Sequence, residues 1–353
     1  MFIKETALAQ LTNNLNNFPL LNQYLASSLK NRAQQDDWYD NRVIRYILRN
    51  SQWVYRLERE FRDAQVNLIE NSKDVFNLQG RGEYDQQLFD AFAEIRLASW
   101  ARNQGYTDIV KLKTSAHKTP DFSMTKPSMS TLAEARHFRV RDYVIDLVYD
   151  RLDGLALKTD GLTKFGLKVE ADDKYDHEYN ILVGPDRSSL EAKYREMVKS
   201  ELTEEFFLRV DKELANNPNT EIAILEGLLV IKRDANPGVI DTQRVGSSNR
   251  EANLKMVLPR LCAALLEKLE QIQAFLDATG YDATHAVVFF SGIDDYEIEW
   301  SDPWDTLADK TSAPQWVRDY INTIHSIASA SIRIPFDLIV GRGNSVKYEP
   351  FPW

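Results

Sequence analysis

From about residue 83 onward, helix-like segments alternate with short apolar runs of strand length. The runs are rich in β-branched residues, as in EIAILEGLLVI, THAVVFFSGI and SIRIPFDLIVG, and helical patterns near 250–278 and 315–330 separate them. Strands that are interleaved with helices imply a mixed sheet covered by helices on both faces. This alternation therefore predicts an α/β domain that spans residues 79–353.

Residues 1–78 have a different pattern, which predicts a helical N-terminal region. Glycine is absent before Gly80, the only proline is Pro19, and apolar residues recur at helical spacing, as in VIRYILRNSQWVYRLEREF. The stretch NLQGRGEYD carries two glycines and is expected to separate this region from the α/β domain.

Composition restricts the class of protein. Hydrophobic residues make up 43% and charged residues 27% of the chain, which is typical of a globular protein and argues against long disorder. A secretory leader and an apolar run of roughly 20 residues are both absent, so we expect a cytoplasmic protein that does not enter a membrane. The single cysteine, Cys262, excludes an internal disulfide and a cysteine-built zinc site. A net charge of −10 disfavours nucleic-acid binding without excluding it, because the charge distribution decides.

The segment 83–139 is predicted to combine one helix with three short strands. EYDQQLFDAFAEIRLASWARNQG has helical periodicity and ends at Gly105, while TDIVKLKT, KTPDFSM and STLAEARHF have the composition of strands. A turn that contains Lys126, Pro127 and Ser128 joins the last two strands, so we expect them to form a β-hairpin.

Three carboxylates occur in this segment in a definite order. Glu94 lies in the helix, Asp121 follows Pro120 at the start of the second strand, and Glu134 lies in the third strand. Residues two apart in a strand share a face, so Glu134 and Arg136 are expected to point the same way. In the predicted hairpin Asp121 and Glu134 converge closely enough to share a divalent cation. Few carboxylate ligands completed by water suit Mg²⁺ or Mn²⁺.

In AEIRLASW, DIVKLK, TPDF and AEARHF the chain resembles the PD-(D/E)xK nuclease superfamily, whose fold is called restriction-endonuclease-like. That family orders an acidic helix, a strand, Pro-Asp, and a strand that ends in Asp/Glu-x-Lys. The resemblance implies that Asp121 and Glu134 bind the metal, that Glu94 supports it, and that the reaction is hydrolysis of phosphodiester bonds in DNA. A restriction, repair or defence role would suit it. Many such nucleases dimerise to cut both strands, although this sequence has no heptad signature of a dimer.

The sequence departs from the family pattern at the lysine position, which Arg136 occupies. Arginine stays protonated in proteins and cannot act as a general base. It either holds the scissile phosphate and orients the attacking water, or it marks a catalytically inactive nuclease-fold protein that binds nucleic acid or acts as a scaffold. Another lysine could reach the site instead, and the candidates in the sequence are Lys111, Lys113, Lys193 and Lys199.

Two sets of arginines are candidates for contacts with nucleic acid. Arg139 and Arg141 lie just beyond the motif and are well placed to meet a substrate phosphate. Arg42, Arg45 and Arg49 recur at helical spacing and form either a cationic stripe that tracks a phosphate backbone or a face paired with acidic groups.

Two further interpretations bear on the motif. The letters Gly184-Pro185-Asp186 and Glu191-Ala192-Lys193 repeat it, but LEAKYREMVKSEL is helical and the spacing is too short for two strands, so we expect no site there. An α/β interaction protein unrelated to nucleases is a third possibility, and it predicts that Glu94, Asp121 and Glu134 lie far apart.

Overall fold

The computed structural model describes residues 4–49, 51–68, 85–112, 119–137, 143–162, 164–171, 187–244, 250–291, 314–342 and 347–351. The chain forms two compact units, each built from separate stretches of sequence. We call them the insert unit (residues 1–15, 29–50 and 141–249) and the six-stranded unit (residues 16–28, 51–140 and 250–353).

The predicted boundary between residues 78 and 79 is not the one along which the chain divides. The N-terminal region is helical, as predicted, but its helices divide between the two units because their apolar faces pack in different cores. These helices are α1 (Lys4–Leu15), α2 (Pro19–Ala33), η1 (Trp38–Asp40), α3 (Arg42–Leu48) and α4 (Gln52–Leu68).

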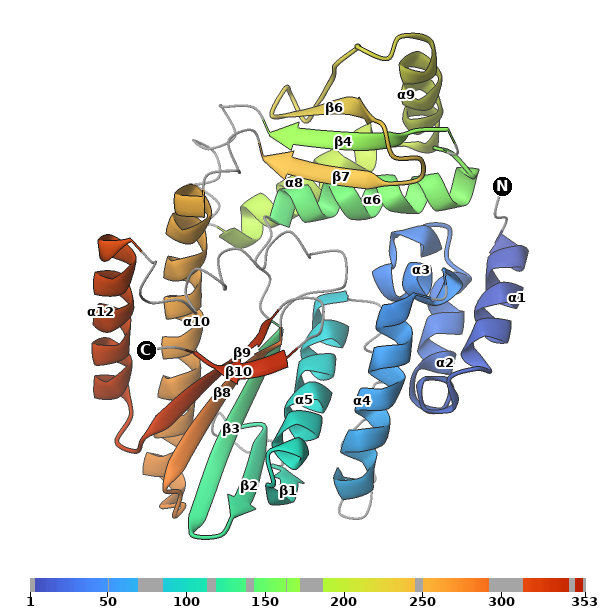
Figure 1. Ribbon diagram of the computed structural model, residues 1–353. Coiled ribbons are helices and arrows are strands. Elements are labelled where there is room, and N and C mark those ends of the chain that lie inside the picture. The colour runs from blue at the N-terminus through green and yellow to red at the C-terminus, as the bar shows by residue number, and fades with distance from the viewer. Residues whose placement is uncertain are drawn as a thin grey trace. The chain divides into compact units, whose positions relative to one another are not determined.

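The six-stranded unit contains a mixed sheet with strand order β1-β2-β3-β8-β9-β10 (Figure 1). The first three strands form an antiparallel meander, β3, β8 and β9 run parallel, and β10 returns antiparallel to β9. The strands are β1 (Thr107–Lys111), β2 (Phe122–Lys126), β3 (Met129–His137), β8 (His285–Ser291), β9 (Phe336–Arg342) and β10 (Lys347–Pro350). The prediction of an α/β fold with a mixed sheet is confirmed for this unit.

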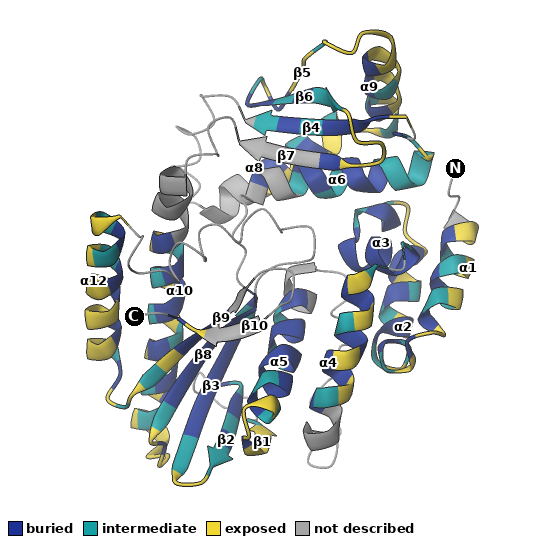
Figure 2. Cartoon of the chain, in the orientation of Figure 1, coloured by how far each residue is buried: buried dark blue, intermediate teal, exposed yellow. Residues whose placement is uncertain are grey.

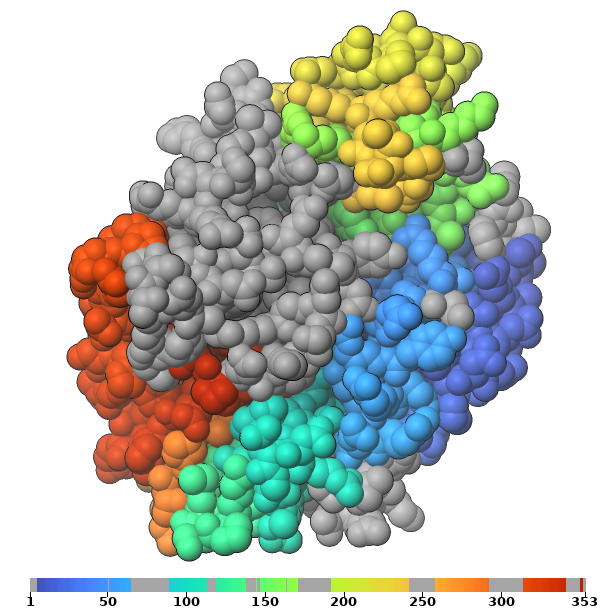
Figure 3. Space-filling view, viewed as in Figure 1, coloured from blue at the N-terminus to red at the C-terminus, as the bar shows by residue number. Residues whose placement is uncertain are grey.

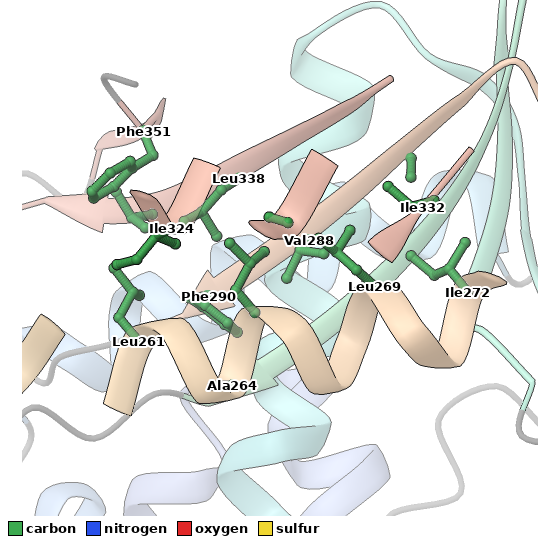
Figure 4. Packing of buried hydrophobic residues seen from close by; sticks show 14 of the residues in the cluster. Leu261, Ala264, Leu269, Ile272, Val288, Phe290, Ile324, Ile332, Leu338 and Phe351 are labelled. Carbon is green, nitrogen blue, oxygen red and sulfur yellow. The ribbon is translucent and has the colours of Figure 1, made fainter. Parts of the chain in front are cut away.

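Helices cover both faces of this sheet, and the alternation of side chains along β3 assigns residues to the two faces. α5 (Asp85–Asn103) packs on the face of Ala133 and Ala135, and α4 packs on α5. Figure 3 shows residues of both helices at the surface. α10 (Arg250–Thr279) and α12 (Gln315–Ser331) bury the opposite face, to which Leu132 contributes. Figure 2 shows the strands β3 and β8 buried between these layers, and Figure 4 shows α10 packed on the same core.

The predicted hairpin is present, and its register aligns the two predicted carboxylates. The turn between β2 and β3 consists of Pro127 and Ser128, and Ser128 has a left-handed φ of 65°. Phe122 pairs with Ala133. One further step along the same register places Asp121 opposite Glu134, and residues that oppose each other in an antiparallel pair lie on one face.

The insert unit contains a second sheet, which corrects the expectation of one sheet for residues 79–353. Its four strands have the order β5-β6-β4-β7. The chain leaves the first sheet after β3 and rejoins it only at β8, after α10. An apolar strand pattern does not reveal which strands will pair. The elements are α6 (Tyr143–Thr159), β4 (Gly166–Ala171), α8 (Arg187–Glu201), α9 (Glu204–Asn216), β5 (Ile222–Ile224), β6 (Leu229–Asp234) and β7 (Ile240–Arg244).

Two segments of the insert unit fold differently from the pattern in the sequence. The stretch from Ser189 to Leu214 reads as one helix but breaks before Thr203, whose hydroxyl accepts a hydrogen bond from the backbone N–H of Phe206 and caps α9. EIAILEGLLVI forms a hairpin, with left-handed residues around Gly227, instead of a single strand. Among the described helices, none is long and apolar enough to span a membrane.

Candidate active site at the start of β2

Asp121 lies immediately before β2, where hydrogen bonds from both neighbouring strands fix it. Its backbone carbonyl accepts a hydrogen bond of 2.9 Å from the N–H of Leu112, which follows β1. Its carboxylate oxygen Oδ2 accepts one of 2.8 Å from the N–H of Ala135 on β3. The side chain is therefore held at the end of the hairpin and its orientation is set by the backbone.

Glu134 lies opposite Asp121 and is almost completely buried, with 1% of the residue exposed. The pKa of Glu134 is raised from 4.5 to about 8, chiefly by burial and also by the negative charge of Asp121 and a hydrogen bond with it, while Lys268 opposes the shift. Asp121 therefore lies close enough to Glu134 to act on its carboxyl group, as the sequence predicted. The pair favours a bound proton or another cation.

Two residues of α10 orient the carboxylate of Glu134. The ammonium Nζ of Lys268 lies 2.9 Å from Oε2 of Glu134. Gln271 donates a hydrogen bond from its side-chain amide to the other oxygen, Oε1, and a second one of 3.2 Å to the carbonyl of Thr119. Burial acts to lower the pKa of Lys268, but the charges of Glu134 and Asp121 outweigh it and raise the pKa above its usual value.

Lys111 approaches Asp121 from the other face of the sheet. Its Nζ lies 3.2 Å from Oδ1 of Asp121 and 2.5 Å from Oε2 of Glu94 on α5. Burial acts to lower the pKa of Lys111, but the charges of Asp121 and Glu94 raise it above its usual value. Glu94 thus reaches Asp121 through an ammonium group, which makes its role indirect.

Glu94, Asp121 and Glu134 form one cluster. The interpretation of the chain as an α/β protein unrelated to nucleases predicted that these residues lie far apart, which is not observed. Within the described part of the chain, however, no three Asp, Glu, His or Cys side chains are arranged to hold a metal ion. Mg²⁺ usually keeps several water ligands and takes one or two carboxylates from a protein, which is the number that Asp121 and Glu134 could offer. Asp121 and Glu134 converge directly and each also contacts an ammonium group, whereas Glu94 reaches the pair only through Lys111.

Arg136 points to the same face as Glu134, as predicted, but its partner is a residue of α10. Its Nη1 lies 2.7 Å from Oε2 of Glu267, and 36% of the Arg136 side chain is exposed. The position that resembles the family's lysine therefore lies at the rim of the cluster.

The other predicted cations lie elsewhere. Arg42 and Arg45 are buried in the insert unit and form ion pairs with Asp150, and Arg45 and Arg49 pair with Asp153. This is the acid-paired alternative for these arginines, and Arg42 and Arg45 have almost no exposed surface with which to follow a phosphate backbone. Lys193 and Lys199 lie on α8 of the same unit, which confirms that the second set of motif letters is helical where it is described. Arg139, Arg141 and Lys113 lie outside the described residues.

Sequence reasoning named Lys111 but missed Lys268 and Gln271. A signal was present, because Lys268 follows Leu261 by seven residues and Leu265 by three, in the middle of the apolar stripe of α10. Figure 4 shows this stripe, with Leu261 beside Ile324, Leu269 beside Val288 and Ile272 beside Ile332. A lysine within a core-facing stripe needs a buried partner of opposite charge.

Comparisons with known proteins gave no match, whether with family models, with curated proteins or with solved structures.

Proposed function

We propose that the chain is a metal-dependent nuclease of the PD-(D/E)xK type with a restriction-endonuclease-like core, and that it hydrolyses phosphodiester bonds in DNA. The observation that carries the proposal is the pair of carboxylates on the β2–β3 hairpin, in which the partly buried Asp121 converges on the buried Glu134. The order of α5, β1, β2 and β3 supports it, because these elements carry Glu94, Pro120-Asp121 and Glu134-x-Arg136 in the order that the family uses.

In this proposal Asp121 and Glu134 hold the cation. When bound there, Mg²⁺ or Mn²⁺ would lower the pKa of a water ligand and neutralise charge that develops on the phosphate. Lys268 and Gln271 keep Glu134 oriented, Lys111 fixes Asp121, and Glu94 positions Lys111. In the reaction a water oxygen bonds to phosphorus, the ester P–O bond breaks, and the leaving oxygen takes up one proton.

Arg136 has a place at the edge of this arrangement. Its ion pair with Glu267 is partly exposed, so replacing Glu267 by a substrate phosphate as its partner would cost little free energy. We assign it contact with a substrate phosphate beside the reacting one. Cutting of both strands requires two sites, which a homodimer of this chain would supply.

The test is a cleavage assay on plasmid, linear and single-stranded DNA and on RNA, with Mg²⁺ or Mn²⁺ and with EDTA. Asp121→Asn and Glu134→Gln each remove one charge with little change of shape, and both are expected to abolish metal-dependent cutting. Asp337→Asn is the matched control, because Asp337 lies on β9 of the same sheet and pairs with His285, away from the cluster. Cutting that survives in both cluster variants would refute the proposal.

The second candidate is a catalytically inactive protein of the same fold that binds nucleic acid or serves as a scaffold. Arg136 in place of the lysine favours it, and the net charge of −10 favours a scaffold over a protein that binds nucleic acid. Binding of Mn²⁺ to the wild-type protein without cleavage of any substrate would select it.

A further inference from the structure

A lysine from another part of the chain, Lys268, lies beside the motif position that Arg136 occupies. Lys268 comes from α10, faces β3, and contacts Glu134 directly at 2.9 Å. The charges of Asp121 and Arg136 both act on it, so it lies within the same cluster as the carboxylate pair and beside the motif position. Only 16% of its side chain is exposed.

A lysine at position 268 is not expected to be favourable for the stability of the fold. On the side of α10 that carries Lys268, the residues Leu261, Ala264, Leu265, Leu269 and Ile272 belong to the apolar core of the six-stranded unit. An ammonium group in such a stripe loses its hydration, and an apolar residue of similar size in place of a buried ion pair is often neutral or stabilising. Charged groups whose pKa is shifted by burial and by a specific charged partner, as in Lys268, are concentrated at functional sites.

Lys268 also has enough hydrogen-bond donors to contact Glu134 and a substrate phosphate at the same time. An ammonium group carries three N–H donors. Its described bond to Glu134 uses one donor, so the same group can bind Glu134 and a phosphate oxygen together. The bond from Gln271 to the other oxygen of Glu134 holds the carboxylate still while Lys268 does so.

We infer that Lys268 is the catalytic lysine of the site: α10 supplies the cation that contacts the scissile phosphate, in place of the residue at position 136 of β3. This inference rests on the proposed nuclease function. Lys268 stays protonated throughout and stabilises the charge that develops on the phosphate oxygens. Arg136, which pairs with Glu267, keeps a peripheral contact only.

The test compares two matched substitutions, Lys268→Gln and Arg136→Gln. Both residues are cations in ion pairs between β3 and α10, and both variants lose one positive charge. Calorimetric titration with Mn²⁺ first gives the dissociation constant of each variant and the concentration that fills the site. Cleavage is then compared at that concentration, on the substrate that the wild-type protein cuts.

We expect Lys268→Gln to bind Mn²⁺ still, with affinity weakened by roughly 10- to 100-fold. At saturating Mn²⁺ its kcat should fall by about 100-fold or more. Arg136→Gln should mainly raise KM. Thermal unfolding checks that each variant folds. Lys268→Met is the replacement if the glutamine variant does not fold, because methionine suits the apolar stripe.

Three results would overturn the inference. Lys268→Gln that cuts like the wild-type protein at saturating Mn²⁺ would remove the lysine from the reaction and leave the proposed function intact. A larger loss of kcat in Arg136→Gln would return the role to β3. A wild-type protein that cuts no substrate would refute the proposed function and this inference with it.

Discussion

The buried carboxyl group of Glu134 makes the stability of the six-stranded unit depend on pH in an unusual direction. Its pKa is raised from 4.5 to about 8 in the folded protein, chiefly by burial and by the charge of Asp121. The folded state therefore binds a proton more tightly than the unfolded state between these two values. The stabilisation is complete below pH 4.5 and is lost as the pH rises through 8.

The magnitude follows from the two pKa values. At about 1.36 kcal/mol per pH unit, the difference between 4.5 and about 8 corresponds to ~5 kcal/mol of unfolding free energy. Little solvent screening reduces it, because Glu134 is 1% exposed. Most of this change should occur between pH 5 and pH 8.

The assay is urea denaturation followed by near-ultraviolet circular dichroism at pH 5 to 9, in EDTA. Glu134→Gln cannot ionise, so its unfolding free energy should lack this decline, and the difference between the two profiles isolates Glu134 from other titrating groups. Under the proposed function, Mg²⁺ should restore stability to the wild-type protein at pH 9, because the ionised pair would bind it in the folded state only. Glu267→Gln is the control on α10 and should follow the wild-type profile. Parallel profiles for wild type and Glu134→Gln would refute the reasoning.

Three predictions concern the insert unit. Gly154→Ala places a Cβ atom 2.3 Å from the backbone oxygen of Tyr39, so thermal unfolding should show a loss of about 1–3 kcal/mol, and an unchanged melting temperature would contradict the tight contact. Arg45→Met strips a fully buried guanidinium from two aspartates, so urea titration should show a loss of about 3–5 kcal/mol, whereas a neutral effect would mean that the aspartates become protonated at little cost. Thr203→Ala removes the cap of α9 and should cost about 1 kcal/mol in the same titration, with Thr203→Ser as the control that keeps it.

The local part of the candidate site was predictable from sequence because local rules determine it. Pro127 and Ser128 define a tight turn, the two-residue period of a strand defines the faces, and together they bring Asp121 and Glu134 opposite each other. Gly105, with φ of 80°, ends the preceding helix at the predicted place.

The rest of the site depends on contacts between distant parts of the chain. Lys268 lies 134 residues from Glu134, and its approach is set by how the apolar stripe of α10 packs on the sheet. The motif alone predicts that Arg136 contacts substrate, and it does not reveal that Glu267 on α10 forms an ion pair with Arg136. The division into units was likewise hidden, because strand patterns in residues 166–244 do not reveal that those strands form a sheet of their own.

The interruption of the six-stranded sheet between β3 and α10 has a consequence for the newly made chain. β3 ends at His137, and α10 begins only at Arg250, after the strands of the insert unit. At typical rates of synthesis, roughly ten seconds separate the emergence of the two elements from the ribosome. During that interval Asp121 and Glu134 exist without the helix that orients Glu134, and Leu132 has no α10 to cover it. The candidate site therefore comes into being late in synthesis, and the nascent chain carries an exposed apolar face for chaperones to protect until α10 arrives.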